Sequence, residues 1–341
     1  MSGLRWAPFI CGGIRTRDFS HGKAYAHDDT LMHRVLDARE PCVVVCGVFD
    51  GIHAGHRTLL HDAMARAHGD GVPCVVATFD PDPGEVLGQS EDVARLLSCE
   101  DRVSGLLSMG ADVVLVYAFT RAFASLEPEQ FVRARLLAVT NPQMVFVGSN
   151  FRYGRGGEGD AGHLSLLGTR MGFGVVSHEL EQRDGEVVSA TRIRSLIAQG
   201  RLEKANELLH RCHYVRGTVE HGRGAGTGFG FPTANVACEP LACMPAEGVY
   251  ACYVICGTHA WPAAVNVGAP PTFSQHKSHF LEASLVGFEG DLYGCDVCVS
   301  FVAWLRASRT FQDIDELTKV VLGNIQWVRQ HLGEERTEVT A

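Results

Sequence analysis

Long apolar runs are missing from this 341-residue chain, although 46% of its residues are hydrophobic. No stretch approaches the roughly 20 apolar residues of a membrane-spanning helix. The first residues also lack the continuous apolar segment of a secretory signal. We therefore expect a cytoplasmic protein with no membrane partner.

A concentration of basic residues is missing as well. Lys and Arg total 30 against 39 Asp and Glu, which gives a net charge of −9. Proteins that bind duplex nucleic acid usually show a basic face, so we expect no nucleic-acid partner, although a local basic pocket for phosphates is compatible with these numbers. The GxxxxGK[ST] motif is absent too, so ATP binding of the P-loop kind is not expected.

The twelve cysteines do not form the dense framework of a small secreted domain. Several lie in apolar, strand-like runs, where a reduced Cys packs as a small hydrophobe. Cys295 and Cys298 have CxxC spacing, but residues 295–299 look like a strand and no second close pair completes a zinc site. We expect core packing here rather than a structural metal.

The pattern of apolar and polar residues divides the chain into three ranges. Residues 1–38 are polar and poorly periodic, which predicts a leader or poorly ordered extension, with Met32 as an alternative start. In residues 39–210 short apolar runs alternate with helical segments, which predicts βαβ units and a parallel sheet. In residues 211–335 short β-rich runs separated by Gly and Pro predict an antiparallel barrel or sandwich, closed by a helix over 314–331.

Two histidines follow the first predicted buried strand, in the run His53-Ala54-Gly55-His56. Ligands of open parallel sheets bind at the carboxyl ends of strands, and a helix N-terminus favours anions. Both imidazoles can donate to phosphate oxygens, and Gly55 leaves room for a nucleotide. The alternative is a pair of surface histidines on a turn.

A second cluster opens a predicted helix at residues 189–194. Ser189 or Thr191 can cap this helix, and Arg192 and Arg194 can offer planar forks to phosphates. A capped helix with solvated arginines explains the same residues equally well. A GxGxxG match at residues 154–159 does not open a helix directly after a strand, so we reject it as a dinucleotide fingerprint.

The second half contains a glycine-rich run at residues 222–230, whose backbone N–H groups can approach phosphates closely. Thr233 and Asn235 follow it and offer oxygen atoms to Mg²⁺ or phosphate. Glu282 lies in a predicted strand and can act as a general base. The alternatives are a flexible loop before an edge strand and a solvent-exposed glutamate.

These motifs carry a family resemblance that runs from about residue 43 to residue 330. The first half resembles the HxGH nucleotidyltransferase superfamily, and more narrowly the FMN adenylyltransferase module of the bacterial bifunctional riboflavin kinase/FAD synthetases. The second half is similar to their riboflavin kinase module. The segments that carry the resemblance are 47–53, 78–83, 119–131, 147–154, 189–194, 230–235, 248–250, 266–268, 271–273, Glu282, 292–294 and 305–306.

The resemblance implies a Rossmann-like domain followed by a six-stranded riboflavin kinase barrel with a terminal helix. It implies that riboflavin is phosphorylated to FMN and that FMN is adenylylated to FAD, with Mg²⁺ and ATP. The implied catalytic residues are Glu282, His53 and His56, and the implied metal ligands are Thr233 and Asn235. The other implied ATP contacts are Gly47, Phe49, Asp50, Gly55, Thr191, Arg192, Arg194, Gly222, Gly226, Gly230 and Pro232, and the flavin contacts are Asn150, Phe151, Tyr153 and Arg306.

Four residues depart from the family pattern: Asp82, Ala190, Thr227 and Ser284. Asp82 and Ala190 motivate an alternative in which only the kinase is active. A flavin-binding protein with little turnover is a further alternative. The oligomeric state is left open.

Overall fold

The computed structural model of the chain describes residues 5–10, 12–88, 94–221, 233–268, 280–309, 311 and 313–339. The chain divides into two compact units: a sheet unit, residues 9–93 with 98–189, and a barrel unit, residues 1–8 and 94–97 with 190–341. The division near residue 190 comes earlier than the boundary predicted at 210. The reason is that α8 (Ala190–Ala198) and α9 (Leu202–Leu209) belong to the barrel unit. Leu202 is part of the barrel core, and the Asn206 amide donates a 3.0 Å hydrogen bond to the Phe301 carbonyl.

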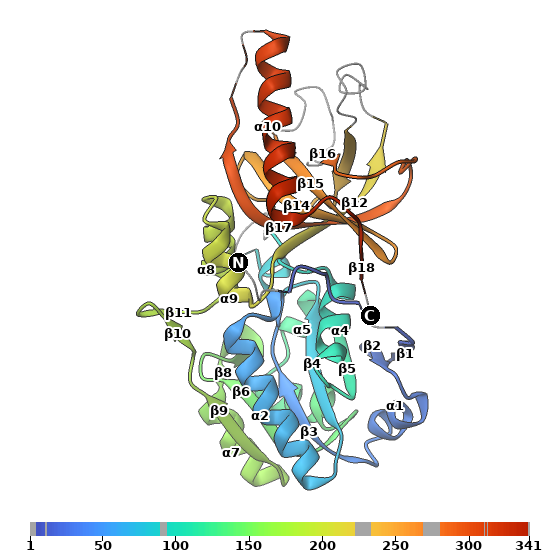
Figure 1. Cartoon of the computed structure of the whole chain (residues 1–341). Helices are drawn as coiled ribbons and strands as arrows, with labels where there is room; N and C mark the ends of the chain where they lie inside the picture. The colour runs from blue at the N-terminus through green and yellow to red at the C-terminus, as the bar shows by residue number, and fades with distance from the viewer. Residues whose placement is uncertain are drawn as a thin grey trace. The chain divides into compact units, whose positions relative to one another are not determined.

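The sheet unit is built on a seven-stranded sheet in the order β1-β2-β5-β4-β3-β6-β9 (Figure 1). Its strands are β1 (Arg15–Phe19), β2 (Gly22–Ala26), β3 (Pro41–Cys46), β4 (Cys74–Asp80), β5 (Val113–Ala118), β6 (Asn141–Gly148) and β9 (Gly174–His178). The pairings among β5, β4, β3, β6 and β9 are all parallel, whereas β1 and β2 pair antiparallel. The predicted parallel sheet is confirmed.

The connecting helices of the sheet unit are α1 (Asp29–Leu36), α2 (Ala54–Asp70), α3 (Pro83–Val86), α4 (Cys99–Ser108), α5 (Arg121–Ala124), α6 (Pro128–Phe131) and α7 (Ala161–Met171). The shorter elements are η1 (Asp50–Ile52), η2 (Val132–Leu136), β7 (Arg152–Tyr153), η3 (Arg155–Gly157), β8 (Gly159–Asp160), β10 (Gln182–Arg183) and β11 (Glu186–Val187). Residues 128–136 do not form one regular helix, because α6 is followed directly by a wider, π-helical turn in η2.

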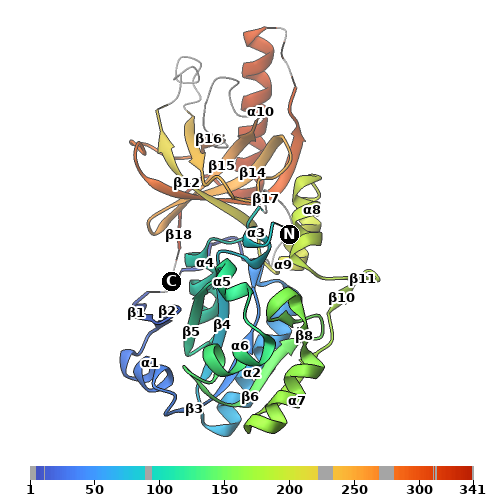
Figure 2. The same ribbon diagram turned by 180° about the vertical axis from the view of Figure 1, so that it is seen from behind.

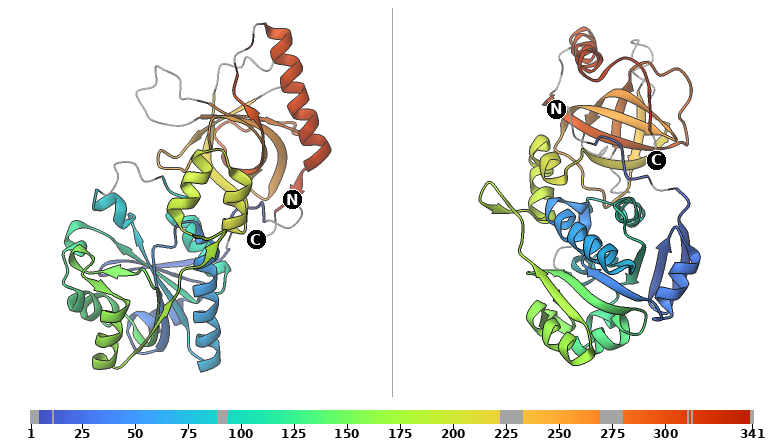
Figure 3. Two further views of the ribbon diagram at one scale, coloured as in Figure 1. Left: turned by 90° about the vertical axis from the view of Figure 1, so that its left-hand side faces the viewer. Right: turned by 60° about the horizontal axis from the view of Figure 1, so that its bottom comes forward.

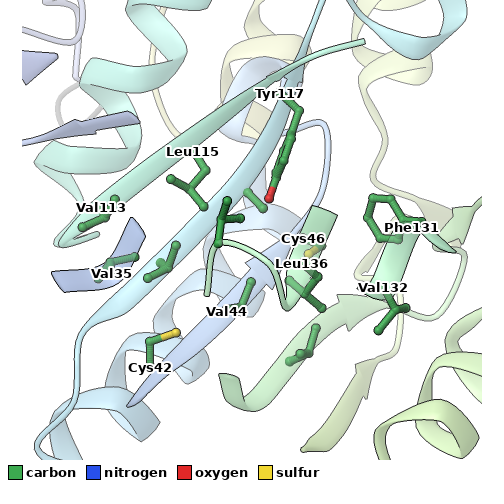
Figure 4. Close-up of a cluster of buried hydrophobic side chains, with 14 of the residues drawn as sticks. Val35, Cys42, Val44, Cys46, Val113, Leu115, Tyr117, Phe131, Val132 and Leu136 are labelled. Carbon is green, nitrogen blue, oxygen red and sulfur yellow. The ribbon is translucent and has the colours of Figure 1, made fainter. Parts of the chain in front are cut away.

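Both faces of this sheet are buried, which explains its continuous apolar strands. Successive side chains of a strand point to opposite faces. Cys42, Val44 and Cys46 of β3 join a cluster with Leu136 of η2 (Figure 4). The alternate residues of β3 face the side where α2 packs, and α2 lies in front of the sheet in Figure 1 and behind it in Figure 2.

Residues 1–38 are not a poorly ordered extension where the structure describes them, which corrects the prediction. β1 and β2 form a hairpin, and β2 adds to the sheet beside β5. Met32 and Val35 of α1 are completely buried in the sheet-unit core. The sequence signal was weak because these strands are short and the buried side chains of β2 are two alanines, Ala24 and Ala26.

The barrel unit is a closed antiparallel barrel in the order β14-β17-β12-β13-β16-β15, in which β15 pairs back to β14. The strands are β12 (His213–Glu220), β13 (Ala234–Cys238), β14 (Gly248–Cys256), β15 (His259–Val267), β16 (Phe280–Leu285) and β17 (Asp296–Ala307), with β18 (Thr337–Glu338) added to β15. The predicted barrel and terminal helix are confirmed.

One stretch of the outer barrel wall is covered by α10 (Ile314–Leu332), as Figure 3 shows. Val328 of α10 packs on Ala251, Ala264 and Ala303, whose small side chains let the helix approach the strands. The interior holds a separate apolar core that includes Tyr250 and Phe301. In the part of the chain that the structure describes, no helix is long and apolar enough to cross a membrane.

The burial of α1 makes a testable prediction. A Met32→Ala variant leaves a cavity in the sheet-unit core, so we expect it to lower the free energy of unfolding by about 2–5 kcal/mol, measured by calorimetry. Thr30→Ala, at an exposed position of the same helix, is the matched control. Equal stability of the two variants would contradict the integration of α1 into the fold.

Candidate functional sites

The carboxyl ends of β4, β3 and β6 meet at one edge of the sheet. β3 pairs in parallel with β4 on one side and with β6 on the other. Since the chain leaves β3 toward β4 and later returns to β6, the strand order reverses at β3. This is the topological switch point where open α/β sheets bind ligands. The segment from Gly47 to His56 occupies this edge.

The turn between β3 and α2 is held in an unusual backbone conformation. Phe49, Gly51 and Ile52 have φ values of 57°, 82° and 46°, a region that residues other than glycine rarely adopt. The Phe49 side chain is fully buried, and a Cβ atom on Gly47 would lie 2.9 Å from its ring. Such strain persists where surrounding contacts enforce it, often at functional sites.

The turn delivers two stacked imidazoles to the start of α2. The ring centroids of His53 and His56 are 3.7 Å apart with 17° between the planes. His53 is the N-cap residue but its side chain makes no capping hydrogen bond, and no acidic residue lies in the first turn. The helix N-terminus therefore keeps its attraction for anions.

Both histidines are held in the neutral state. Burial lowers the pKa of His53 to about 4, although Glu181 acts in the opposite direction. Burial, and then the electrostatic influence of His53 and Arg102, lower the pKa of His56 well below its ordinary value. Among the described residues, neither buried Nδ1 atom has a hydrogen-bond partner. Buried polar atoms without a partner are costly, so this arrangement is suited to a ligand that supplies one.

Arg102 of α4 is a component of this site that the sequence analysis missed. Its guanidinium donates to the carbonyls of Val48 at 3.1 Å and Phe79 at 2.8 Å, and its side chain is 5% exposed. The Thr78 hydroxyl donates to the same Val48 carbonyl at 2.9 Å. The guanidinium also lies 3.7 Å from the Asp80 carboxylate, so an ion pair joins the ends of β3 and β4 near His56. The sequence around Arg102 has an ordinary helical pattern, which does not show that its side chain reaches the site.

The predicted flavin-side residues follow β6, next to β3. Asn150 is exposed, and its side-chain oxygen lies over Gly148, 3.0 Å from where a Cβ would be. Phe151 is half-buried and stacks on Tyr153 with centroids 5.6 Å apart. Tyr153 is buried against Phe131, and its hydroxyl hydrogen-bonds His163 Nδ1 at 3.0 Å. Tyr153 thus supports Phe151 from the core side.

Two acidic residues near this edge have structural partners. Asp82 caps α3, since its carboxylate accepts a 2.8 Å hydrogen bond from the Gly84 N–H. The departure from the family pattern at Asp82 therefore has a local role in helix capping. Glu181 accepts a 3.1 Å hydrogen bond from Thr58 of α2, and its Cβ lies 3.6 Å from where a Cβ on Gly55 would be.

The cluster at residues 191–194 opens α8, in the barrel unit. Thr191 is exposed, and its hydroxyl accepts a 3.3 Å hydrogen bond from the Arg194 guanidinium. Arg192 and Arg194 are half-buried. α8 therefore belongs to the barrel unit, whereas His53 and His56 belong to the sheet unit.

In the barrel, strand register places three polar residues side by side. Glu282 of β16 lies opposite Asn235 of β13 and also opposite Asn266 of β15. Directly opposed residues of antiparallel strands have Cβ atoms about 4.5–5.5 Å apart. Their neighbours along each strand, among them Val236 and Leu281, belong to the barrel core. The three polar side chains therefore share the outer face, and Asn266 is a member that the sequence analysis did not assign to the site.

The other predicted barrel residues flank this row of Asn235, Glu282 and Asn266. Thr233 is half-buried directly before β13, and Ser284 is buried on the same face of β16 as Glu282. Arg306 of β17 lies opposite Val249, which in turn lies opposite Asn266. Burial lowers the pKa of Arg306. Gly222, Gly226, Gly230, Pro232 and Thr227 lie outside the described residues.

Comparisons with known proteins agree with this division. A match to the FAD synthetase family covers residues 36–192, and a match to the riboflavin kinase family covers residues 209–332. The Bifunctional riboflavin kinase/FMN adenylyltransferase of Bacillus subtilis is 31% identical, over 85% of this chain and 92% of the relative. The protein of the same name from Escherichia coli K12 is 32% identical, over 89% and 96%.

The chain belongs to this bifunctional family. The predicted family and fold class are therefore confirmed. A solved structure from Streptococcus pneumoniae, titled a macrolide-efflux protein, superimposes with a TM-score of 0.78 at 29% identity and covers 85% of this chain and 94% of its own. Its title describes an activity different from that of the curated relatives.

The neutral state of His53 is directly testable. Burial disfavours the imidazolium, so a pH well below the ordinary value of 6.5 is needed to protonate it. We expect the NMR signals of the His53 ring, assigned by their loss in His53→Gln, to stay constant from about pH 8 to 5.5 and to move only below that range. A titration midpoint near 6.5 in the ligand-free protein would contradict the buried, neutral site.

Proposed function

We propose that this chain makes FAD from riboflavin in two ATP-dependent steps, one in each compact unit. The barrel unit phosphorylates riboflavin to FMN, and the sheet unit transfers the adenylyl group of ATP to FMN. The observation that carries the proposal for the sheet unit is the stacked, neutral His53–His56 pair at the switch point of the sheet.

In adenylyl transfer, a phosphate oxygen of FMN attacks the α-phosphorus of ATP, and the bond to the β-phosphate breaks to release pyrophosphate. No protein nucleophile is needed, so catalysis rests on positioning and on stabilisation of charge. His53 and His56 donate hydrogen bonds to the phosphate oxygens on which charge builds. Arg102, paired with Asp80, holds the strand ends next to His56, and Asn150 and Phe151 contact the flavin.

The remaining nucleotide contacts proposed in the sheet unit come from its turn. Gly47, Phe49 and Asp50 shape the turn, and Gly55 leaves backbone room for the nucleotide. Thr191, Arg192 and Arg194 of α8, in the barrel unit, are proposed as phosphate contacts on the basis of the family resemblance. Asp82, the departure from the family pattern in this unit, has a local role in the structure, because its carboxylate caps α3.

In the kinase step, the terminal ribityl hydroxyl of riboflavin attacks the γ-phosphorus of ATP and ADP leaves. Glu282 is proposed as the general base that takes the hydroxyl proton. Asn235 and Asn266 lie opposite it on either side, so amide groups border the carboxylate. Arg306 is proposed to contact the flavin on the same side of the barrel.

The donor set beside Glu282 fits Mg²⁺. This ion prefers oxygen ligands and is usually held by one or two protein groups together with substrate phosphates. Thr233 and Asn235 are proposed to hold it, with the ion neutralising charge on the phosphates of ATP. Among the described residues, no three His, Cys, Asp or Glu side chains are grouped to bind a metal by themselves, which agrees with an ion that arrives with ATP.

The adenylyl site is tested by His53→Ala and His56→Ala. We expect each to lower the rate of FAD formation from FMN by about 10²–10³-fold, because one hydrogen-bond donor to the transition state is lost. Riboflavin phosphorylation should be unchanged. His61→Ala, on the same helix with an 81% exposed side chain, is the matched control. Full FAD synthesis by both site variants would rule out this assignment.

The kinase site is tested by Glu282→Gln. We expect this variant to lower riboflavin phosphorylation by about 10²–10⁴-fold through loss of the general base, and to leave adenylylation of added FMN unchanged. Glu289→Gln removes an exposed carboxylate after the same strand and should behave as the unmodified protein. Equal kinase rates for the two variants would show that Glu282 is not the base.

A further inference from the structure

Two half-exposed cysteine side chains meet at one end of the barrel. Cys256 is the last residue of β14, and Cys295 directly precedes β17. β14 and β17 pair antiparallel, with Ile255 opposite Cys298. Cys256 therefore lies close to the residues that begin β17, and a side-chain hydrogen bond links its thiol to that of Cys295.

Their surroundings distinguish this pair from the other cysteines. Of the described cysteines, eight are buried and only Cys99, Cys256 and Cys295 are partly exposed. Cys256 and Cys295 both border the barrel core, while Gly257, Gly294 and Asp296 beside them are exposed. Both residues are therefore partly accessible to solvent.

The segment that carries Cys295 is fixed to the neighbouring strand. The Val219 N–H of β12 donates to the Cys295 carbonyl at 2.9 Å, and the Gly294 N–H donates to the Val219 carbonyl at 2.8 Å. The Tyr293 ring stacks on His221 with centroids 3.8 Å apart. Because this backbone is held in place, the two thiols stay together.

We propose that Cys256 and Cys295 form a reversible oxidation site that takes low-molecular-weight disulfides as co-reactant and crosslinks β14 to the start of β17. Neither residue belongs to the flavin or ATP sites assigned above. The crosslink closes a loop of about 40 residues that contains β15 and β16, so it should stabilise the barrel against unfolding.

The exchange runs in two steps that balance. The Cys295 thiolate attacks one sulfur of glutathione disulfide, which forms a mixed disulfide and releases one glutathione thiolate. Burial and the nearby Cys295 raise the pKa of Cys256, so Cys256 stays protonated until its proton passes to solvent. Its sulfur then attacks Cys295 Sγ and displaces the second glutathione. The protein loses two hydrogen atoms and the glutathione disulfide is reduced to two thiols.

The test uses the full chain and glutathione disulfide. We expect peptide mapping to show a Cys256–Cys295 crosslink and a loss of two free thiols, both reversed by dithiothreitol. Calorimetry should show an unfolding transition several degrees higher in the oxidised form than in the reduced form. Both readouts are independent of catalytic activity.

Two variants make the outcome decisive. Cys256→Ser should keep its unfolding temperature on oxidation and form only a mixed disulfide at Cys295. Cys99→Ser, which removes the other half-exposed thiol, should still form the crosslink. The proposal is overturned if the folded, unmodified protein forms no Cys256–Cys295 crosslink at high glutathione disulfide, or if the crosslinked protein unfolds at the same temperature as the reduced one.

Discussion

The parallel pairing of β3 with β4 on one side and β6 on the other is the constraint on which the first site depends. This pairing brings the carboxyl ends of three strands to one edge of the sheet. The turn between β3 and α2 must then take a conformation that fits these ends. Arg102 joins the carbonyls of Val48 and Phe79 across two of those ends. The strained turn and the stacked histidines follow from this fixed base, so the chemistry of the site is built on the rigid part of the fold.

In the barrel, the alternation of side chains along each strand positions the site residues. Because side chains alternate between the two faces of a strand, the core residues around Glu282 oblige Glu282 itself to face outward. Register then decides its neighbours, Asn235 and Asn266. The two units thus bring their polar site residues together in different ways. One places polar groups at the ends of parallel strands, and the other places them in a row across antiparallel strands.

Much of this organisation was predictable from the sequence. The apolar runs indicated β3, β4, β5, β6 and β9. The change near residue 213 from helical segments to short β-rich runs indicated the barrel. The HxGH signature and Glu282 marked the two candidate sites. Short strands with small buried side chains, such as β2, carry too little pattern to be recognised. Arg102 and Asn266 acquire their places only through tertiary packing and strand register, which no local spacing reveals.

The central claim is that one chain carries two separate activities, and product analysis tests it most directly. The full chain is supplied with riboflavin, ATP and Mg²⁺, and flavins and nucleotides are separated over time. We expect FMN to rise and then convert to FAD, with ADP and pyrophosphate released in turn. A folded protein that yields neither flavin product, or that accumulates FMN without FAD even when FMN is supplied, would contradict the account.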